Sequence, residues 1–86
     1  MKVYIPSPLR SYTQQRDEVD AEGPTLADLL TALDRLYPGL RFRIINEQDR
    51  IREHIKIFIN REQAYDLAAS LGPQDEVSIL CALSGG

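Results

Sequence analysis

TLADLLTALDRL, residues 25–36, is the most informative stretch of this sequence, because it has the pattern of one amphipathic helix. Thr25 is a favourable N-cap, and Asp28, three positions later, completes a weak form of the capping box. Pro38-Gly39 then ends the helix. The apolar stripe consists of five leucines at helical spacing, all of which we expect in the core: Leu26, Leu29, Leu30, Leu33 and Leu36.

Alternating apolar residues on both sides of the helix predict strands. Before it, residues 2–5 and 18–21 form an opening hairpin, joined by a long connection that includes the polar residues 11–17. After it, the isoleucines of residues 55–59 predict a strong strand, and residues 77–83 predict a final one. This order indicates an α+β fold, with one mixed sheet packed on one main helix. The first and last strands would lie side by side in the centre of that sheet.

Two further segments have weaker patterns. Residues 41–49 are mixed, with Ile44 and Ile45 expected to be buried and residues 46–49 expected to form a turn. Residues 63–71 have apolar positions at helical spacing, so they form either a short helix or an irregular crossing.

Composition restricts the class of protein. The 86 residues suffice for one domain, which we expect to span residues 1–86 with a flexible tail over residues 82–86. The net charge is −3, and acidic residues alternate with the basic ones that gather between Arg41 and Arg61, so nucleic acid is not an expected partner. The sequence has no long apolar run and no leader-like segment, which predicts no membrane association and a cytoplasmic location.

The residue types that often carry chemistry have structural interpretations here. Cys81 shares the alternation of the final strand, so we interpret it as a buried, inert thiol rather than a nucleophile. His54 has no Ser or Cys partner in a triad arrangement, and we place it at the edge of a strand. Asp17, Glu18 and Asp20 are interpreted as a solvated loop. We therefore predict no catalytic residue and no metal site.

Five segments, in the expected order and spread over nearly the whole length of the chain, resemble the ubiquitin-like β-grasp sulfur carriers (the MoaD/ThiS family). They are residues 5–10 (IPSPLR), 37–40 (YPGL), 55–60 (IKIFIN), 75–79 (DEVSI) and the terminal Gly85-Gly86. The chain departs from the family pattern at Gln74, where a glycine is usual. It is most similar to the branch that supplies sulfur for cysteine biosynthesis. The resemblance implies a β-grasp fold and a protein cosubstrate that is not itself an enzyme.

The resemblance also implies a chemistry for the tail. In this family an activating enzyme uses ATP to adenylate the C-terminal carboxylate, and a sulfur donor then displaces AMP to leave a thiocarboxylate. Gly86 would carry the sulfur, and Leu83, Ser84 and Gly85 would thread the tail into the partner. Glycines suit this role because they are slim and tolerate unusual backbone angles. Extended, the last five residues reach about 16 Å. A chain that stops on the second glycine needs no proteolytic maturation, and no cofactor is expected on the chain itself.

The implied partners are a ubiquitin-activating-type adenylyltransferase (MoeB/ThiF-like), a sulfur donor of the rhodanese or cysteine desulfurase type, a PLP-dependent acceptor enzyme similar to cysteine synthase, and a JAMM-type metalloprotease. Phe58, expected on the outer sheet face, and Leu80 are candidate anchors for a partner. The alternative for Phe58 is packing beneath residues 63–71. Two other functions stay open: the small subunit of a molybdopterin synthase, and a ubiquitin-like modifier joined to lysines through Gly86.

Overall fold

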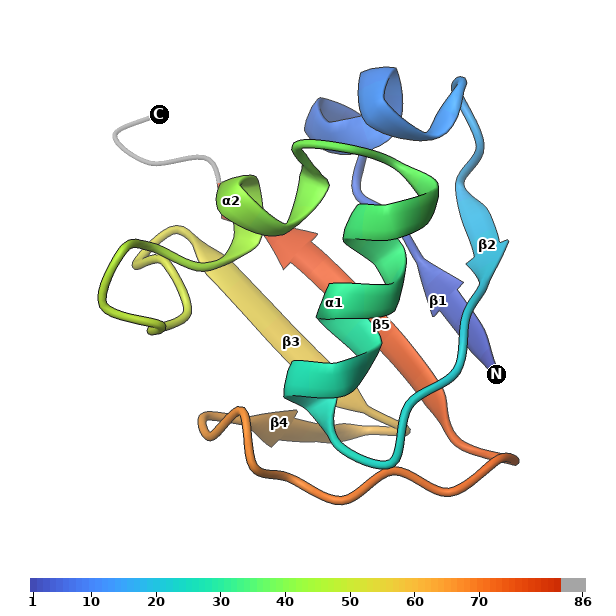
Figure 1. Cartoon of the computed structure of the whole chain (residues 1–86), viewed down its shortest axis with the longest axis vertical. Helices are drawn as coiled ribbons and strands as arrows, with labels where there is room; N and C mark the ends of the chain where they lie inside the picture. The colour runs from blue at the N-terminus through green and yellow to red at the C-terminus, as the bar shows by residue number, and fades with distance from the viewer. Residues whose placement is uncertain (83–86) are drawn as a thin grey trace.

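The computed structural model describes residues 1–82, in which five strands form one mixed sheet (Figure 1). Its order is β2-β1-β5-β3-β4. β1 and β5 pair in parallel, and the other neighbouring strands are antiparallel. The expected opening hairpin and the central placement of the first and last strands are therefore confirmed. The strands are β1 (Lys2–Tyr4), β2 (Glu18–Asp20), β3 (Ile55–Ile59), β4 (Glu62–Ala64) and β5 (Glu76–Cys81).

The main helix, α1, spans Leu26–Leu36 as its sequence pattern predicts. The hydroxyl of Thr25 accepts a hydrogen bond from the backbone N–H of Asp28 at 3.3 Å and donates one to the Asp28 carboxylate at 2.8 Å. Four leucines of α1 are fully buried, but Leu36 is 56% exposed, so the expectation of five core leucines is wrong at this position. Leu36 lies in the last turn, where Leu33 and Leu40 already fill the interior.

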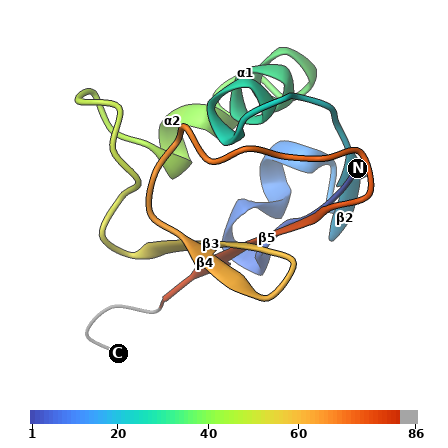
Figure 2. The ribbon, with the colours of Figure 1, turned by 90° about the horizontal axis from the view of Figure 1, so that it is seen from below.

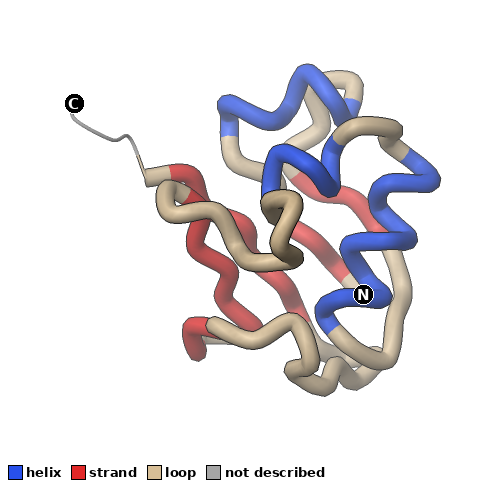
Figure 3. Tube along the Cα trace, turned by 60° about the vertical axis from the view of Figure 1, so that its left-hand side comes forward, coloured by secondary structure: helices blue, strands red, loops and turns tan. Residues whose placement is uncertain are grey.

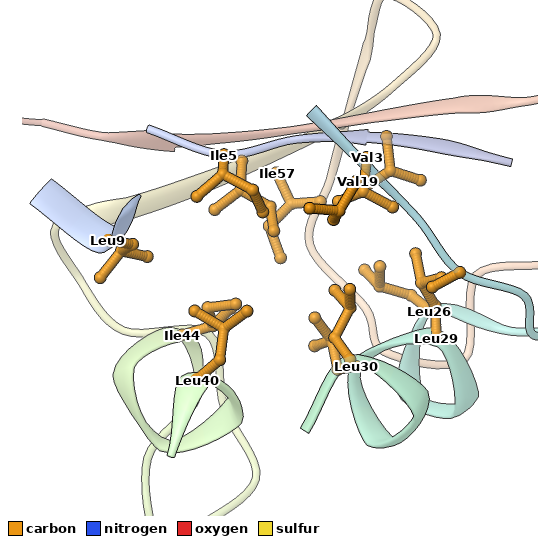
Figure 4. Packing of buried hydrophobic residues seen from close by; sticks show 14 of the residues in the cluster. Val3, Ile5, Leu9, Val19, Leu26, Leu29, Leu30, Leu40, Ile44 and Ile57 are labelled. Atoms are coloured by element: carbon orange, nitrogen blue, oxygen red, sulfur yellow. The ribbon is translucent and has the colours of Figure 1, made fainter. Parts of the chain in front are cut away.

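The helices lie together on one face of the sheet (Figures 2 and 3). Their apolar side chains meet those of the strands in a single core (Figure 4). Within residues 1–82, no helix covers the opposite face of the sheet, which we call the outer face. The fully buried side chains of this core include Val3, Leu26, Leu29, Leu30, Leu33, Leu40, Ile44, Ile45, Ile57 and Val77.

Two short helices were not expected from the sequence. A 3₁₀ helix, η1, spans Ser7–Thr13 and therefore includes part of the expected polar connection. The second helix, α2, spans Leu40–Ile44 and begins where the Asp34 carboxylate accepts hydrogen bonds from the backbone N–H groups of Gly39 and Arg41, at 3.1 and 3.2 Å. A five-residue helix has little intrinsic stability, so this contact from α1 is needed to define its start.

Residues 63–71 form the irregular crossing, and the helical alternative is wrong. The segment begins as β4, which pairs with β3 across a tight turn at Asn60 and Arg61. It then runs past the N-terminal end of α1, where the carbonyls of Ala69 and Leu67 accept hydrogen bonds from Leu26 and Ala27. The first N–H groups of a helix have no acceptor within that helix, so the crossing supplies the missing hydrogen-bond acceptors at the start of α1.

Candidate functional site

β5 leads to the tail, and β3 holds it up to its last residue, while β1 holds only its first three residues. It pairs with β1 on one side, and on the other it pairs with β3 as far as Cys81, which lies opposite Ile55. One residue further on, the backbone N–H of Ala82 donates a 2.7 Å hydrogen bond to the carbonyl of His54. The sheet therefore fixes the position and direction of the chain at Ala82, which we call the tail exit.

The four residues predicted to work in the tail are Leu83, Ser84, Gly85 and Gly86, and they lie outside the described residues. Their assigned roles remain predictions. Four extended residues span at most about 14 Å. A carboxyl group at Gly86 would therefore lie within that distance of the tail exit.

Phe58 and Leu80 both belong to the outer face. In the sheet register Phe58 lies opposite Ser78, and Leu80 lies opposite Lys56, so they occupy neighbouring rows on adjacent strands. Phe58 is half-buried and does not pack against the core, whereas Leu80 is 48% exposed. The expected outer position of Phe58 is thus observed. Its use by a partner stays a prediction.

Cys81 and His54 adjoin the tail exit. The Cys81 side chain packs against the edge of the core, but it is half-buried rather than fully buried as expected, because two hollows open beside the end of β5. Burial raises the pKa of its thiol, which lowers the fraction present as thiolate. His54 is exposed and immediately precedes β3, at the expected strand edge. The described contact of His54 with Ala82 uses its backbone carbonyl.

The two hollows flank the tail exit. One, of about 640 Å³, lies between η1, α2 and the start of β3, and its lining includes Tyr12, Phe42 and Cys81. The other, of about 560 Å³, lies on the side of Pro6 and Pro8 and has a mostly apolar lining. Ala82 and Cys81 line both hollows, so a partner that receives the tail would meet both of them.

Four cationic side chains line these hollows: Arg10, Arg43, Arg52 and Lys56. We call this group the basic rim. Sequence reasoning did not identify it, because its members are distant in the sequence and only the fold brings them to one end of the sheet. The modest concentration of basic residues between Arg41 and Arg61 was the available signal.

Two absences hold for the part of the chain that the structure describes. No three side chains of His, Cys, Asp or Glu type come together there in a way that could hold a metal ion. No helix among residues 1–82 is both long enough and apolar enough to cross a membrane.

A mixed five-stranded sheet packed on one main helix, with β1 and β5 parallel at its centre, places the chain in the ubiquitin-like β-grasp class. Comparison of the sequence with models of protein families identifies one family, because the ThiS family model matches residues 3–86. The chain therefore belongs to the ThiS family.

Individual relatives agree with this assignment. The sulfur carrier protein CysO of Mycobacterium tuberculosis is 30% identical over 89 aligned residues, which cover 98% of this chain and 96% of CysO. Its crystal structure superposes with a TM-score of 0.90 at 29% identity, covering 95% of this chain and 98% of that chain. The expected resemblance to the ubiquitin-like sulfur carriers is confirmed, and the branch found is that of CysO.

Two further structures are also similar. CysO in the BexX/CysO complex of Amycolatopsis orientalis has a TM-score of 0.91 at 27% identity, covering 99% of this chain and 98% of that chain. The small archaeal modifier protein 1 of Methanosarcina acetivorans has a TM-score of 0.82 at 29% identity, covering 99% and 94%.

Proposed function

We propose that this carrier holds sulfur as a thiocarboxylate on Gly86 and donates it in the biosynthesis of cysteine or another sulfur-containing metabolite. The main support is that the ThiS family match extends through Gly85-Gly86 and that CysO, a sulfur carrier, aligns over nearly the full chain. The fold adds that β3 fixes β5 up to the tail exit, and that β1 pairs with the first three residues of the same strand. The folded domain thereby holds the start of the reactive C-terminal tail in a fixed position.

The proposed chemistry has two steps. The Gly86 carboxylate attacks the α-phosphorus of ATP on an adenylyltransferase, which releases pyrophosphate and leaves an acyl adenylate. A sulfide sulfur then attacks the acyl carbon, the bond to the AMP oxygen breaks, and a thiocarboxylate forms with loss of one proton. When the sulfur comes as a persulfide from a rhodanese or cysteine desulfurase, a second thiol cleaves the resulting acyl disulfide. ATP is consumed by the partner enzyme, and the chain supplies only the acyl group.

Delivery requires an acceptor. The proposed acceptor is a PLP-dependent enzyme of the cysteine synthase type, with a JAMM-type metalloprotease to release a product that stays attached to the tail. That the CysO of Amycolatopsis orientalis forms a complex with BexX supports a carrier that docks through this fold.

The test is the appearance of a new reactive sulfur. A thiocarboxylate and a single oxidation add nearly the same mass, and Cys81 is the one cysteine in the chain, so the assay uses the Cys81→Ala variant. This variant is incubated with ATP, sulfide and each ThiF-type adenylyltransferase of the source organism, and then treated with iodoacetamide. We expect one carbamidomethyl group per chain by intact mass. Deleting Gly86 should abolish it. An unlabelled Cys81→Ala chain with every adenylyltransferase would refute the proposal.

A second function, protein modification, is favoured by the likeness to a small archaeal modifier protein. Here the activated Gly86 would form an isopeptide bond with a lysine of another protein. The last basic residue of the chain is Arg61, so trypsin would leave a long and easily missed remnant. A Ser84→Arg variant expressed in the source organism shortens that remnant to Gly-Gly. Lysines bearing it, and missing when Gly86 is deleted, would establish this second function, and their absence with a Ser84→Arg chain that an adenylyltransferase still activates would exclude it.

A further inference from the structure

The arginines of the basic rim are ordered by neutral partners. The Nε of Arg43 donates to the Tyr12 hydroxyl at 2.7 Å, and the Nε of Arg52 donates to the Phe42 carbonyl at 2.7 Å. The guanidinium of Arg52 also stacks on the exposed Phe42 ring, 4.7 Å from its centre. Arg10 is fixed in the same way, since its Nε donates to the carbonyl of Ile5 at 3.0 Å. Each bond holds a side chain in place and leaves its positive charge uncompensated.

Among residues 1–82, none of the four rim cations forms an ion pair. The linings of the two hollows contain no Asp or Glu. The whole chain has a net charge of −3, so this absence of acids is a local departure from its composition. Four of the acidic residues lie in and beside β2, an edge strand separated from β5 by β1: Asp17, Glu18, Asp20 and Glu22. The positive charge of the basic rim is therefore a local feature of the two hollows at the tail exit.

We propose that the basic rim docks against an acidic protein surface around the entrance through which the activating enzyme takes up the tail. This inference rests on the proposed function, and it adds the chemistry of the partner surface. Charge complementarity of this kind speeds encounter and fixes orientation. The tail would thus be aimed at the entrance before it is threaded.

A protein surface fits the rim better than a small anion does. The cations lie on both sides of the tail exit, and all are half-buried or exposed, so they do not enclose a pocket of ionic size. Exposed apolar side chains lie among them, namely Phe42 at 53% and Leu80 at 48% exposure. Aromatic and arginine side chains mixed with polar ones are typical of protein interfaces.

The first experiment needs no identified enzyme. The ¹⁵N-labelled chain is titrated with an octaglutamate peptide at low salt, and amide shifts are followed by NMR. We expect shifts confined to the residues around Arg10, Arg43, Arg52 and Lys56, and their loss at high salt, since charges separated by more than about 10 Å are screened at 0.1 M. The Lys56→Gln, Arg52→Gln double variant, which removes two positive charges, should bind the peptide at least about fivefold more weakly.

Arg61→Glu is the matched control. Arg61 is exposed and lies in the turn after β3, at the opposite end of that strand from Lys56. It should bind the peptide about as well as the wild type. Equal weakening by Arg61→Glu, shifts outside the rim, or the same shifts with inorganic phosphate at equal concentration would each overturn the inference.

The second experiment measures ATP–pyrophosphate exchange with the adenylyltransferase that activates the chain. The double rim variant should raise the KM for the carrier about fivefold or more and leave kcat unchanged, whereas Arg61→Glu should change neither. A lowered kcat at unchanged KM would contradict docking. If no adenylyltransferase activates the wild-type chain, the proposed function fails, while the peptide titration still decides whether the rim binds an acidic surface.

Discussion

Replacing Gly23 by Ala should destabilise the protein, although the change adds a single methyl group. An ideal Cβ at Gly23 would lie 2.5 Å from the backbone N of Leu29 and 2.9 Å from the carbonyl carbon of Asp28. Ordinary contacts between such atoms are about 3.5–4.0 Å. Gly23 must therefore move by about 1 Å, because the helix backbone has no alternative rotamer.

Neither side of this contact moves freely. Leu29 is fully buried in the core, and on the other side the carbonyl of Pro24 accepts a 2.9 Å hydrogen bond from Leu71. Overpacking of this kind costs about 1–3 kcal/mol. Gly→Ala also removes freedom from the unfolded chain, which offsets about 0.4–1 kcal/mol. The net loss is about 1–2 kcal/mol, and Tm should fall by about 5–15 °C in a domain of this size.

Urea and thermal unfolding would measure this loss, with Gly72→Ala as the matched control. Neither Gly23 nor Gly72 has a left-handed φ, but a Cβ at Gly72 would meet its nearest atom, an oxygen of Asp75, at 3.6 Å, an ordinary contact. Gly72→Ala should therefore be neutral or stabilising by up to about 1 kcal/mol. If Gly23→Ala is as stable as Gly72→Ala, the close approach to α1 is not what requires glycine at position 23.

Other expected outcomes concern the core, the stability at low pH and the reactivity of the Cys81 thiol. Leu33→Ala should cost about 2–5 kcal/mol in urea unfolding because Leu33 is fully buried, while Leu36→Ala should cost less than about 0.5 kcal/mol; equal losses would contradict the exposed position of Leu36. Hydrogen bonds from the Gly72 N–H and from the Asn60 side chain lower the pKa of Asp75 below its ordinary value of 3.8. Its carboxylate therefore contributes fully above that value, and the contribution disappears as the pH falls through the lowered pKa, so stability measured against pH should decline less steeply below about pH 4 in Asp75→Asn than in the wild type. Cys81 should react with iodoacetamide more slowly at pH 8 in the folded chain than in urea, because burial raises the pKa of its thiol; equal rates would show that it is not shielded.

Sequence patterns were sufficient to predict the elements whose stabilising contacts lie close together in the sequence. The leucine stripe and the Thr25 cap define α1, and strict alternation defines β3 and β5. The structure departs from these expectations where a group distant in the sequence determines the local backbone structure. β4 is three residues long and exists because Asn60, at φ +59°, turns the chain back on β3. α2 begins at a cap supplied by Asp34 from another helix. Ala64, Leu67 and Leu71 pack against the core, but the backbone carbonyls of this segment accept hydrogen bonds from the start of α1.

The same reason explains what was predictable at the candidate site. The central position of β5 and the outer placement of Phe58 follow from alternation and strand order. The basic rim does not, since Arg10 comes from η1, Arg43 from α2, and Lys56 from β3. Only tertiary structure brings these charges to the tail exit.

The position of β5 between β1 and β3 has a mechanical consequence. Five residue pairs join β5 to β3 as far as Cys81, beside the tail exit, and three join it to β1 between Glu76 and Ser78, further back along the strand. Tension applied through Ala82 acts lengthwise on that strand, so it loads the hydrogen bonds to β3 in shear first and those to β1 behind them. A force applied across the strand would instead break the hydrogen bonds one after another. A partner can therefore pull on the C-terminal end of this carrier while the domain stays folded.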